Sequence, residues 1–378
     1  MIITLSTVLN IVFFSGVAIL SLNYIITKSD FVLKIEIQIV LLIMVMIMFR
    51  LFLPFELPTQ NNINVTKFWP DIYIIFVKPI FVFAEMEWSL LPIMIIISII
   101  GSIIFVIKLI LSYIALKHTV SNFKTINNPA VNQVVDKINS EYKKQICFNV
   151  VSSSQVKSPF ILGLLNPIII LPEIELSVDE LYYILSHEMA HYYFKDLWIR
   201  FICELLQAIY WWNPFVYLLR KQLIKIQELH VDSVVINKLS EFQKMEYLEC
   251  LIKIARLQSD IHRTYWIAAF NSDCEDDIAN RIEAIFEYTK GSEVKNKRAI
   301  KHVLVGLVLV LSIFLMPNFI IFEPYAIADE HIEGTYEINE ANSYLIQNND
   351  GTYDVYVDQK HVGTVTEIFD NSLVIYNE

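Results

Sequence analysis

Four long apolar runs limit what this chain can fold into more than any other feature of its sequence. They cover residues 1–27, 35–53, 90–116 and 303–322 of 378. The first run carries no charged side chain, and about 20 such residues suffice for a helix to cross the hydrocarbon core of a bilayer. A hydrophobic content of 55% excludes an ordinary soluble domain. The runs therefore predict a mainly α-helical, multi-pass membrane protein with four spanning helices.

Basic residues predict the orientation of these helices, because loops on the cytoplasmic side are enriched in lysine and arginine. The residues that carry this signal are Lys28, Lys34, Lys117, Lys124, Lys295, Lys297, Arg298 and Lys301. We expect three spans within residues 1–116, with an external loop near 54–88, and a cytoplasmic domain over 117–300. A fourth span over 301–322 then leads to an external segment, 323–378. Both termini are expected outside the cell membrane of a bacterium.

Residues 323–378 form an acidic tail that we predict to be a small extracytoplasmic antiparallel β domain. The tail holds twelve acidic residues and one base, Lys360, so its net charge of −11 equals that of the whole chain. Alternation in "TYDVYV", a turn at "NDG", and the runs "VGTVTEIF" and "LVIY" predict three to five strands. Such an excess of acid argues against direct binding of nucleic acid.

The segment 295–329 allows two interpretations. As a spanning helix, it anchors the acidic tail. It also has a basic start, an apolar middle and small residues at Ala326 and Ala328, the layout of a signal peptidase site. Cleavage after Ala328 would release the tail.

The segment 117–300 combines short strands, "ICFNVV" and "PIIILP", with long helices. One helix is predicted from Ser177 to Asn213, with Ser177 and Glu180 forming a capping box. Asn213-Pro214 ends or kinks it, and a second helix follows to about Leu239. The stretch "LWIRFICELLQAIYWW" is apolar enough to be embedded in the membrane or to lie at its surface, and the sequence leaves both open.

The stretch "LSHEMAHYYFKD", residues 185–196, contains a candidate metal site. His187 and His191 are four residues apart, so on a helix they share a face and can bind one metal ion through their imidazole nitrogens. Glu188 is placed to hold a water molecule at the metal and to take a proton from it. The alternative is a pair of histidines on a partly buried helix face.

A catalytic zinc ion needs a third protein ligand, and "IQELHVD" supplies candidates for it. Glu228 and Asp232 share a helix face. A helix pair hinged at 213–214 would bring Glu228 to the metal and let Asp232 accept a hydrogen bond from a ligand histidine. His230 is a rival ligand, but it points about 160° away from Glu228 around the helix. Asp196, five residues after the second histidine, is another candidate to orient a ligand.

These motifs resemble the BlaR/MecR-type antirepressor membrane metallopeptidases of the gluzincin clan. The resemblance rests on "HEMAHYYFKD", "WWNPFVYLLRKQ" and "ELHVD", and on "VKSPFILGLLNPIIILP" and "NRIEAIF". It covers about residues 1–322 and is most specific over 156–232. It implies a gluzincin-like α+β protease domain with His187, His191 and Glu228 as Zn²⁺ ligands and Glu188 as general base. It also implies a winged-helix transcriptional repressor in the cytoplasm as substrate, self-cleavage, and a possible homodimer.

The chain departs from the β-lactam sensors of that family in its external segment. Those sensors carry a penicillin-binding domain with a serine acylated in an S-x-x-K motif, and the 56-residue tail has no such motif. "SNFK" (121–124) and "SQVK" (154–157) fall on the expected cytoplasmic side. We therefore expect the input to be a peptide, an envelope stress or a partner protein.

Two other functions fit the same residues. One is a quality-control membrane metalloprotease, which the Asn-Pro break and the external β tail disfavour. The other is a non-catalytic transmembrane receptor with a structural metal, which has no need of Glu188. For the peptidase, we expect a substrate strand to pair with a sheet edge at "NPIIIL" (166–171). Tyr192, Tyr193 and Tyr210 are candidate donors to the oxyanion or packing residues.

Overall fold

The computed structural model describes twelve ranges of the chain. These are residues 5–27, 37–53, 74–76, 78–83, 86–126, 128–259, 281–282, 285–286, 343–347, 352–357, 360–365 and 373–377. The chain forms two compact units, one made of Met1–Ile63 and Val77–Ile321, the other of Asn64–Phe76 and Phe322–Glu378. The predicted fourth span, the basic cluster before it and the candidate cleavage site at Ala328 lie outside the described residues.

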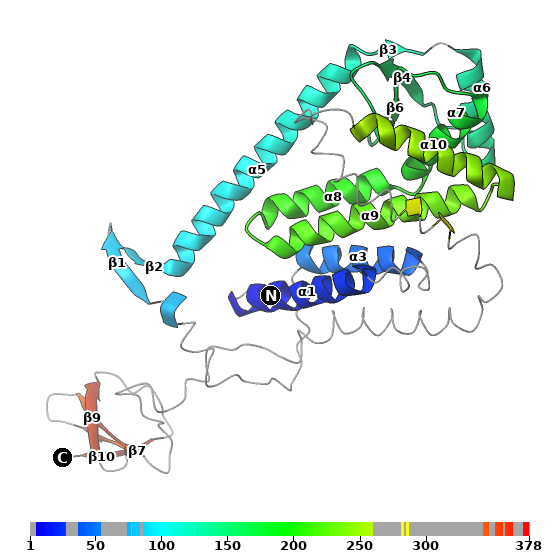
Figure 1. Cartoon of the computed structure of the whole chain (residues 1–378). Coiled ribbons are helices and arrows are strands. Elements are labelled where there is room, and N and C mark those ends of the chain that lie inside the picture. The colour runs from blue at the N-terminus through cyan, green and yellow to red at the C-terminus, as the bar shows by residue number, and fades with distance from the viewer. Residues whose placement is uncertain are drawn as a thin grey trace, which may run out of the picture. The chain divides into compact units, whose positions relative to one another are not determined.

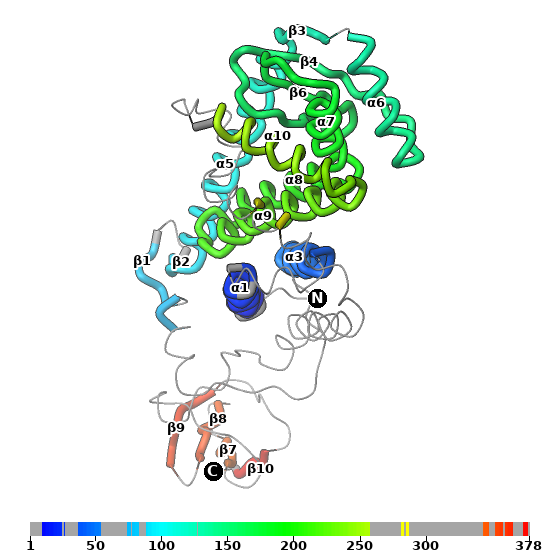
Figure 2. Tube along the Cα trace, turned by 45° about the vertical axis from the view of Figure 1, so that its right-hand side comes forward, coloured from blue at the N-terminus to red at the C-terminus, as the bar shows by residue number. Residues whose placement is uncertain are grey.

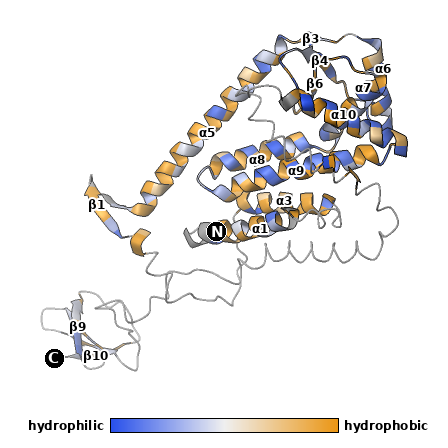
Figure 3. Ribbon diagram, in the orientation of Figure 1, coloured by the Kyte–Doolittle hydropathy of each residue, from blue (hydrophilic) through white to orange (hydrophobic). Residues whose placement is uncertain are grey.

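The part of the first unit that the structure describes begins with three long apolar helices (Figure 1). They are α1 (Leu5–Thr27), α3 (Ile37–Phe52) and α5 (Leu90–Ser121). Among the residues that the structure describes, α5 alone is long and apolar enough to cross a membrane, while 10–24 and 37–52 are shorter apolar helices. Figure 3 shows α5 as apolar over most of its length. The third predicted span is thus a helix of spanning length, and the number of spans stays a prediction.

A short hairpin precedes α5. It consists of β1 (Pro79–Phe83) and β2 (Met86–Ser89), which pair antiparallel. The rings of Phe81 and Trp88 stack across it with their centroids 6.4 Å apart. The hairpin falls at the end of the segment predicted as an external loop.

A four-stranded sheet and helix α6 (Pro129–Glu141) begin the domain that follows α5. The strands are β3 (Lys124–Thr125), β4 (Asn149–Ser153), β5 (Phe160–Leu162) and β6 (Ile168–Pro172), in the order β3-β4-β6-β5. The predicted edge strand at 166–171 is therefore wrong, because β6 pairs with β4 on one side and β5 on the other. Ile169 and Ile170 are fully buried, as expected of a central strand. The edge on that side of the sheet is β5.

Within the described range 128–259, the sheet is followed by α7 (Val178–Tyr193), α8 (Asp196–Ile209), α9 (Pro214–Ile236) and α10 (Glu241–Ser259). The capping box at Ser177 is confirmed, with Ser177 N to Glu180 Oε2 at 2.8 Å and Glu180 N to Ser177 Oγ at 3.1 Å. The break at Asn213-Pro214 is confirmed too, since Asn213 caps α9 and Pro214 is its first residue.

The prediction of one continuous helix from Ser177 to Asn213 is wrong. The chain turns at Lys195, which has a left-handed backbone with φ of 65°, and α8 starts at the next residue. Left-handed turns at a helix end favour glycine or asparagine. Because Lys195 is a lysine within a continuous helical pattern, the sequence does not indicate a turn at this position.

Helix α9 belongs to two separate hydrophobic cores. Its first half packs with α8 against α1 and α3, through residues such as Val216, Leu219 and Leu223. Its second half packs with α6, α7, α10 and the sheet, through residues such as Val231 and Val235. Figure 2 shows α1 and α3 below the α8–α9 pair, with α7 and the sheet above it.

The second unit contains a four-stranded sheet of β7 (Ser343–Gln347), β8 (Tyr353–Val357), β9 (Lys360–Val365) and β10 (Val374–Asn377). Their order is β10-β7-β8-β9. The β7–β8 and β8–β9 pairs are antiparallel, as predicted, but β10 pairs parallel to β7. A fully antiparallel sheet is therefore wrong, because the chain crosses from β9 to the far edge. Leu345, Val355, Val357 and Leu373 form its small core.

Candidate metal centre

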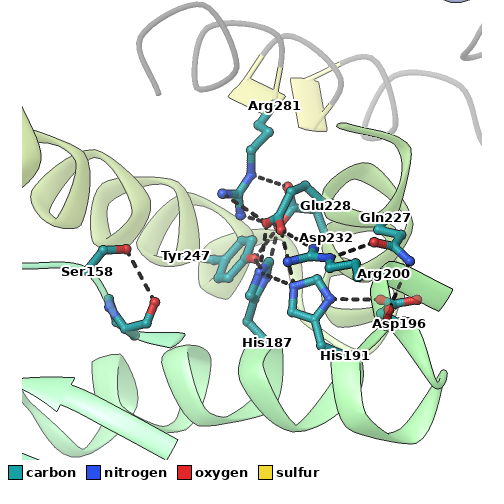
Figure 4. Close-up of polar contacts among 11 residues, drawn as sticks. Ser158, His187, His191, Asp196, Arg200, Gln227, Glu228, Asp232, Tyr247 and Arg281 are labelled. Atoms are coloured by element: carbon teal, nitrogen blue, oxygen red, sulfur yellow. Dashed lines mark hydrogen bonds and ion pairs between the residues drawn. The ribbon is translucent and has the colours of Figure 1, made fainter. Parts of the chain in front are cut away.

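Helices α7 and α9 bring three potential metal ligands together (Figure 4). His187 Nε2 lies 3.3 Å from His191 Nε2 and 3.3 Å from Glu228 Oε2, and His191 Nε2 lies 3.4 Å from Glu228 Oε1. Both histidines are buried, and the Glu228 side chain is 19% exposed. Among the described residues, these three form the cluster that can hold a metal ion.

The spacing of these atoms suits zinc. A tetrahedral zinc ion bound at about 2.0–2.1 Å keeps its ligand atoms about 3.3 Å apart. The three separations of 3.3–3.4 Å match that value. Two histidines and one glutamate, with a fourth position left for water or substrate, are a ligand set that catalytic zinc uses.

Each histidine is oriented by a carboxylate at its other nitrogen. His191 Nδ1 lies 2.7 Å from Asp196 Oδ2, and His187 Nδ1 lies 3.2 Å from Asp232 Oδ1. A carboxylate at Nδ1 holds the ring proton there, so both Nε2 atoms turn lone pairs toward each other and toward Glu228. Only a positive charge between them, a metal ion or a proton, makes this arrangement favourable.

Tyr247 completes the surroundings of His187. Its hydroxyl donates to Asp232 Oδ1 at 2.6 Å and lies 3.0 Å from His187 Nδ1. The side chain is buried, and burial and the nearby Asp232 raise the pKa of the hydroxyl well above its usual value, so it stays a donor. Sequence reasoning missed Tyr247, because α10 carries no recognisable motif around it.

Two arginines balance the acidic side of the cluster. Arg281 donates from Nε to Asp232 Oδ2 at 2.7 Å and from Nη2 to Asp232 Oδ1 at 2.8 Å. Arg200 on α8 donates to Glu228 Oε1 at 2.9 Å and to Gln227 Oε1 at 2.7 Å. Neither arginine was predicted as a site residue, although Arg281 lies within the "NRIEAIF" stretch that carries the family resemblance.

Glu188 is a buried carboxyl beside the cluster and lines the same cavity as the three ligands. Burial raises its pKa above the usual value, and the neighbouring His187 and His191 offset only part of that rise. A carboxylate with a raised pKa is a better proton acceptor near neutral pH. Glu188 can therefore move protons without being a metal ligand.

The potential ligands His187 and Glu228 also have shifted pKa values. Burial lowers the pKa of His187, but its contacts with Asp232 and Glu228 outweigh burial and raise that pKa to about 9. Burial raises the pKa of Glu228, but His191, His187 and Arg281 outweigh it and lower that pKa well below the usual value. The same acidic groups that favour a proton on His187 would favour a metal cation at this position.

A cavity of about 630 Å³ extends from the cluster. Its walls include Phe160, Ile161 and Leu162 of β5, parts of α7 to α10, and the α5 residues Val106, Leu109, Ile110 and Tyr113. Most lining residues are apolar, as in sites that bind peptides or small molecules. Edge strand β5 lies on this cavity.

The other residues that the sequence offered as a metal ligand or as oxyanion donors lie outside the cluster. The His230 ring packs against Phe194 with a centroid distance of 4.6 Å, and it does not line the cavity. Three tyrosine hydroxyls bond away from the cluster: Tyr192 to the Leu165 carbonyl, Tyr193 to Asn139, and Tyr210 to the Leu51 carbonyl. The hydroxyls of these tyrosines therefore have partners outside the cluster, and His230 lies outside it too.

The comparisons with known proteins agree with this site. The family model for the BlaR1 peptidase M56 matches residues 79–285. The chain is 28% identical over 187 residues to the regulatory protein BlaR1 of Bacillus licheniformis. The aligned residues make up 49% of this chain and 31% of that protein. The chain is 24% identical over 242 residues to the methicillin resistance mecR1 proteins of Staphylococcus aureus and Staphylococcus epidermidis, covering 63% of this chain and 36% of theirs.

The chain thus spans about a third of the length of these curated relatives. The matched family segment is more than half of the chain and contains the whole cluster, from His187 to Arg281. The sequence motifs, the geometry of the ligands and the family match lead to one conclusion: this chain belongs to the BlaR1 peptidase M56 family.

Proposed function

We propose that the chain is a zinc endopeptidase of the cell membrane. In this proposal it transduces an external signal by cutting a cytoplasmic winged-helix repressor, itself, or both. One observation supports the proposal most strongly: the Nε2 atoms of His187 and His191 and the carboxylate of Glu228 are separated by distances that suit zinc, and the buried Glu188 lies beside them. Zinc, when bound there, would act as a Lewis acid toward the scissile carbonyl and lower the pKa of water.

The residues of the chain supply the remaining chemistry. Glu188 takes a proton from the attacking water and hands it to the leaving amine, so that one carboxyl serves as base and then as acid. Asp196 and Asp232 fix the rings of the two ligand histidines, and Tyr247 and Arg281 fix Asp232. The protein therefore holds the reacting groups in place before the substrate arrives.

The substrate segment would add as a strand beside β5. Strand β5 is the sheet edge that lines the cavity, and an extended peptide paired with it would run past the metal cluster. The repressor as substrate rests on the resemblance of the sequence motifs to the antirepressor metallopeptidases, and the relatives are named as a regulatory protein and methicillin resistance proteins. The external sheet of β7–β10 would then belong to the input side.

A pair of blots tests the proposal. The protein carries an internal tag, a co-encoded repressor carries another, and wild type is compared with Glu188→Ala. Fragments that appear only in wild type would establish the peptidase and identify what it cuts. Identical patterns, with zinc still bound to both proteins, would contradict it and favour a non-catalytic receptor. Cutting of many unrelated membrane proteins would favour quality control.

A further inference from the structure

The turn between α8 and α9 is inserted among the apolar helices of the N-terminal region. Gly101 of α5 leaves room for Trp211, since a Cβ placed on Gly101 would lie 2.3 Å from the indole. Gly16 of α1 leaves room for Phe215 in the same way, with a Cβ at 2.8 Å from its ring. The Tyr210 hydroxyl donates to the carbonyl of Leu51 in α3 at 2.9 Å. One aromatic side chain thus contacts each apolar helix.

The depth of these contacts follows from helix geometry. Gly101 lies eleven residues after Leu90, the first residue of α5, which is about 16 Å along the helix. Half of a hydrocarbon core is about 15 Å. Gly16 is the central residue of the 23-residue α1. If α1 and α5 cross the bilayer, both glycines lie near its middle, and the residues that contact them, Trp211 and Phe215, lie there too.

Three backbone carbonyls at the turn have partners within the protein. Non-helical backbone inside a bilayer needs its polar groups satisfied by protein. The carbonyl of Ile209 accepts from Ser102 Oγ at 3.2 Å, that of Tyr210 from Asn213 N at 2.8 Å, and that of Trp211 from the Tyr217 hydroxyl at 2.9 Å. Three consecutive carbonyls therefore need no water.

The exposed side chains of α8 and α9 are also suited to contact with lipid. Those exposed on the surface of α8, α9 and the turn include Trp198, Ile202, Ile209, Trp212 and Tyr217, each between 37% and 46% exposed. The first charged residues met from the turn along each helix, Glu204 and Arg220, pair with each other. Charges within a membrane are found paired in this way.

We propose that α8 and α9 form a re-entrant hairpin. Its turn, 210–213, lies in the hydrocarbon core, and lipid acyl chains cover its exposed apolar side chains. The hairpin enters and leaves on the same side, so it does not reverse the topology of the segments that follow. Glu228 lies fifteen residues after Asn213, about 22 Å along α9. The metal cluster therefore stays at the membrane surface.

Depth-dependent quenching tests the hairpin in the full chain reconstituted in phosphatidylcholine vesicles. An environment-sensitive fluorophore is attached at Trp212→Cys after the four native cysteines have been replaced by alanine. Matched labels are placed at Ile104→Cys, on the exposed surface of α5, and at Leu165→Cys, in the loop between β5 and β6. Lipids carry a spin label either in the acyl chain or at the headgroup.

We expect the label at residue 212 to behave like the label at 104, with acyl-chain quenching several-fold stronger than headgroup quenching. The label at 165 should show little quenching by either lipid. A label at 212 that behaves like the one at 165 would overturn the proposal, and so would a label at 104 that is not quenched. These outcomes do not depend on peptidase activity.

A second measurement uses the unmodified chain. A phosphatidylcholine with a photoreactive diazirine in its acyl chain is incorporated into the same vesicles, and lipid adducts are mapped by mass spectrometry. Adducts within residues 198–217 are expected beside those on α5. Adducts on α5 with none on the hairpin would contradict the re-entrant arrangement.

Discussion

Replacing Asp196 with asparagine tests how much a carboxylate behind the metal ligand contributes to zinc binding. The carboxylate accepts from His191 Nδ1 at 2.7 Å and is 1% exposed. In Asp196→Asn the side-chain amide oxygen can still accept the Nδ1 proton, so the orientation of the ring is kept and only the charge is lost. Charge-assisted hydrogen bonds are about twice as strong as neutral ones, which makes the difference about 1–1.5 kcal/mol.

That energy corresponds to about a ten-fold loss of zinc affinity for Asp196→Asn. Asp196→Ala removes the acceptor as well, and we expect about a hundred-fold loss, the upper end for residues that support a metal ligand. Both are measured by competition with a chromophoric zinc chelator, using the full chain in detergent near neutral pH. Asp179→Asn, an exposed carboxylate at the start of the preceding helix α7, is the matched control and should bind zinc like wild type.

Affinities of both Asp196 variants within two-fold of wild type would refute the reasoning. Zinc would then not be held by His191 Nε2, or the ring would be fixed by other contacts. Equal losses in the Asp179→Asn control would show a general effect of removing negative charge. Only a loss that is graded from asparagine to alanine, and absent from the control, supports the role given to Asp196.

Three further outcomes follow from the structure. With zinc removed by a chelator, the raised pKa of His187, about 9, means that its proton stabilises the fold fully below about pH 6.5. This contribution to stability is lost as the pH rises to 9, so the Tm measured in the presence of the chelator should fall over that range. Zinc affinity should rise over the same range, because zinc and the proton compete for His187. Arg281→Met leaves a buried aspartate without its cation and should lower the stability of the domain by about 3–5 kcal/mol, seen as a lower Tm. Gly101→Ala should cost about 1–3 kcal/mol because Trp211 must move, whereas Gly363→Ala, with open space around it, should be neutral in the same thermal assay.

The sequence predicted the parts of the site that depend on spacing within a helix. His187 and His191 are four apart, and Glu228 and Asp232 are four apart, so helical periodicity alone puts each pair on one face. Asn213-Pro214 indicated the break before α9, but α7 and α9 are brought together by this break and by the unpredicted turn at Lys195. The structure places all four side chains in one cluster, and their roles remain proposals.

Other parts could not be predicted from local pattern. Tyr247 and Arg281 reach the cluster from segments distant in sequence. Nothing near Tyr247 marks it as part of a site, and the "NRIEAIF" stretch around Arg281 carries the family resemblance without showing that the arginine contacts Asp232. The turn at Lys195 uses a residue type that does not favour a left-handed backbone. The parallel β10–β7 pair and the central position of β6 depend on which strands meet, and alternation within one strand does not encode its neighbours.

The two cores of α9 have a consequence for how the site can be controlled. One end of this helix packs against α1 and α3, and the other end carries Glu228. If the packing of α1 and α3 against α9 changes the free energy of zinc binding, then zinc binding must change the free energy of that packing by the same amount. Where such a difference exists, zinc acts as an effector of the packing of α1 and α3 on α9. Titrating zinc while probing the packing of α1 on α9 would measure the reciprocal coupling directly.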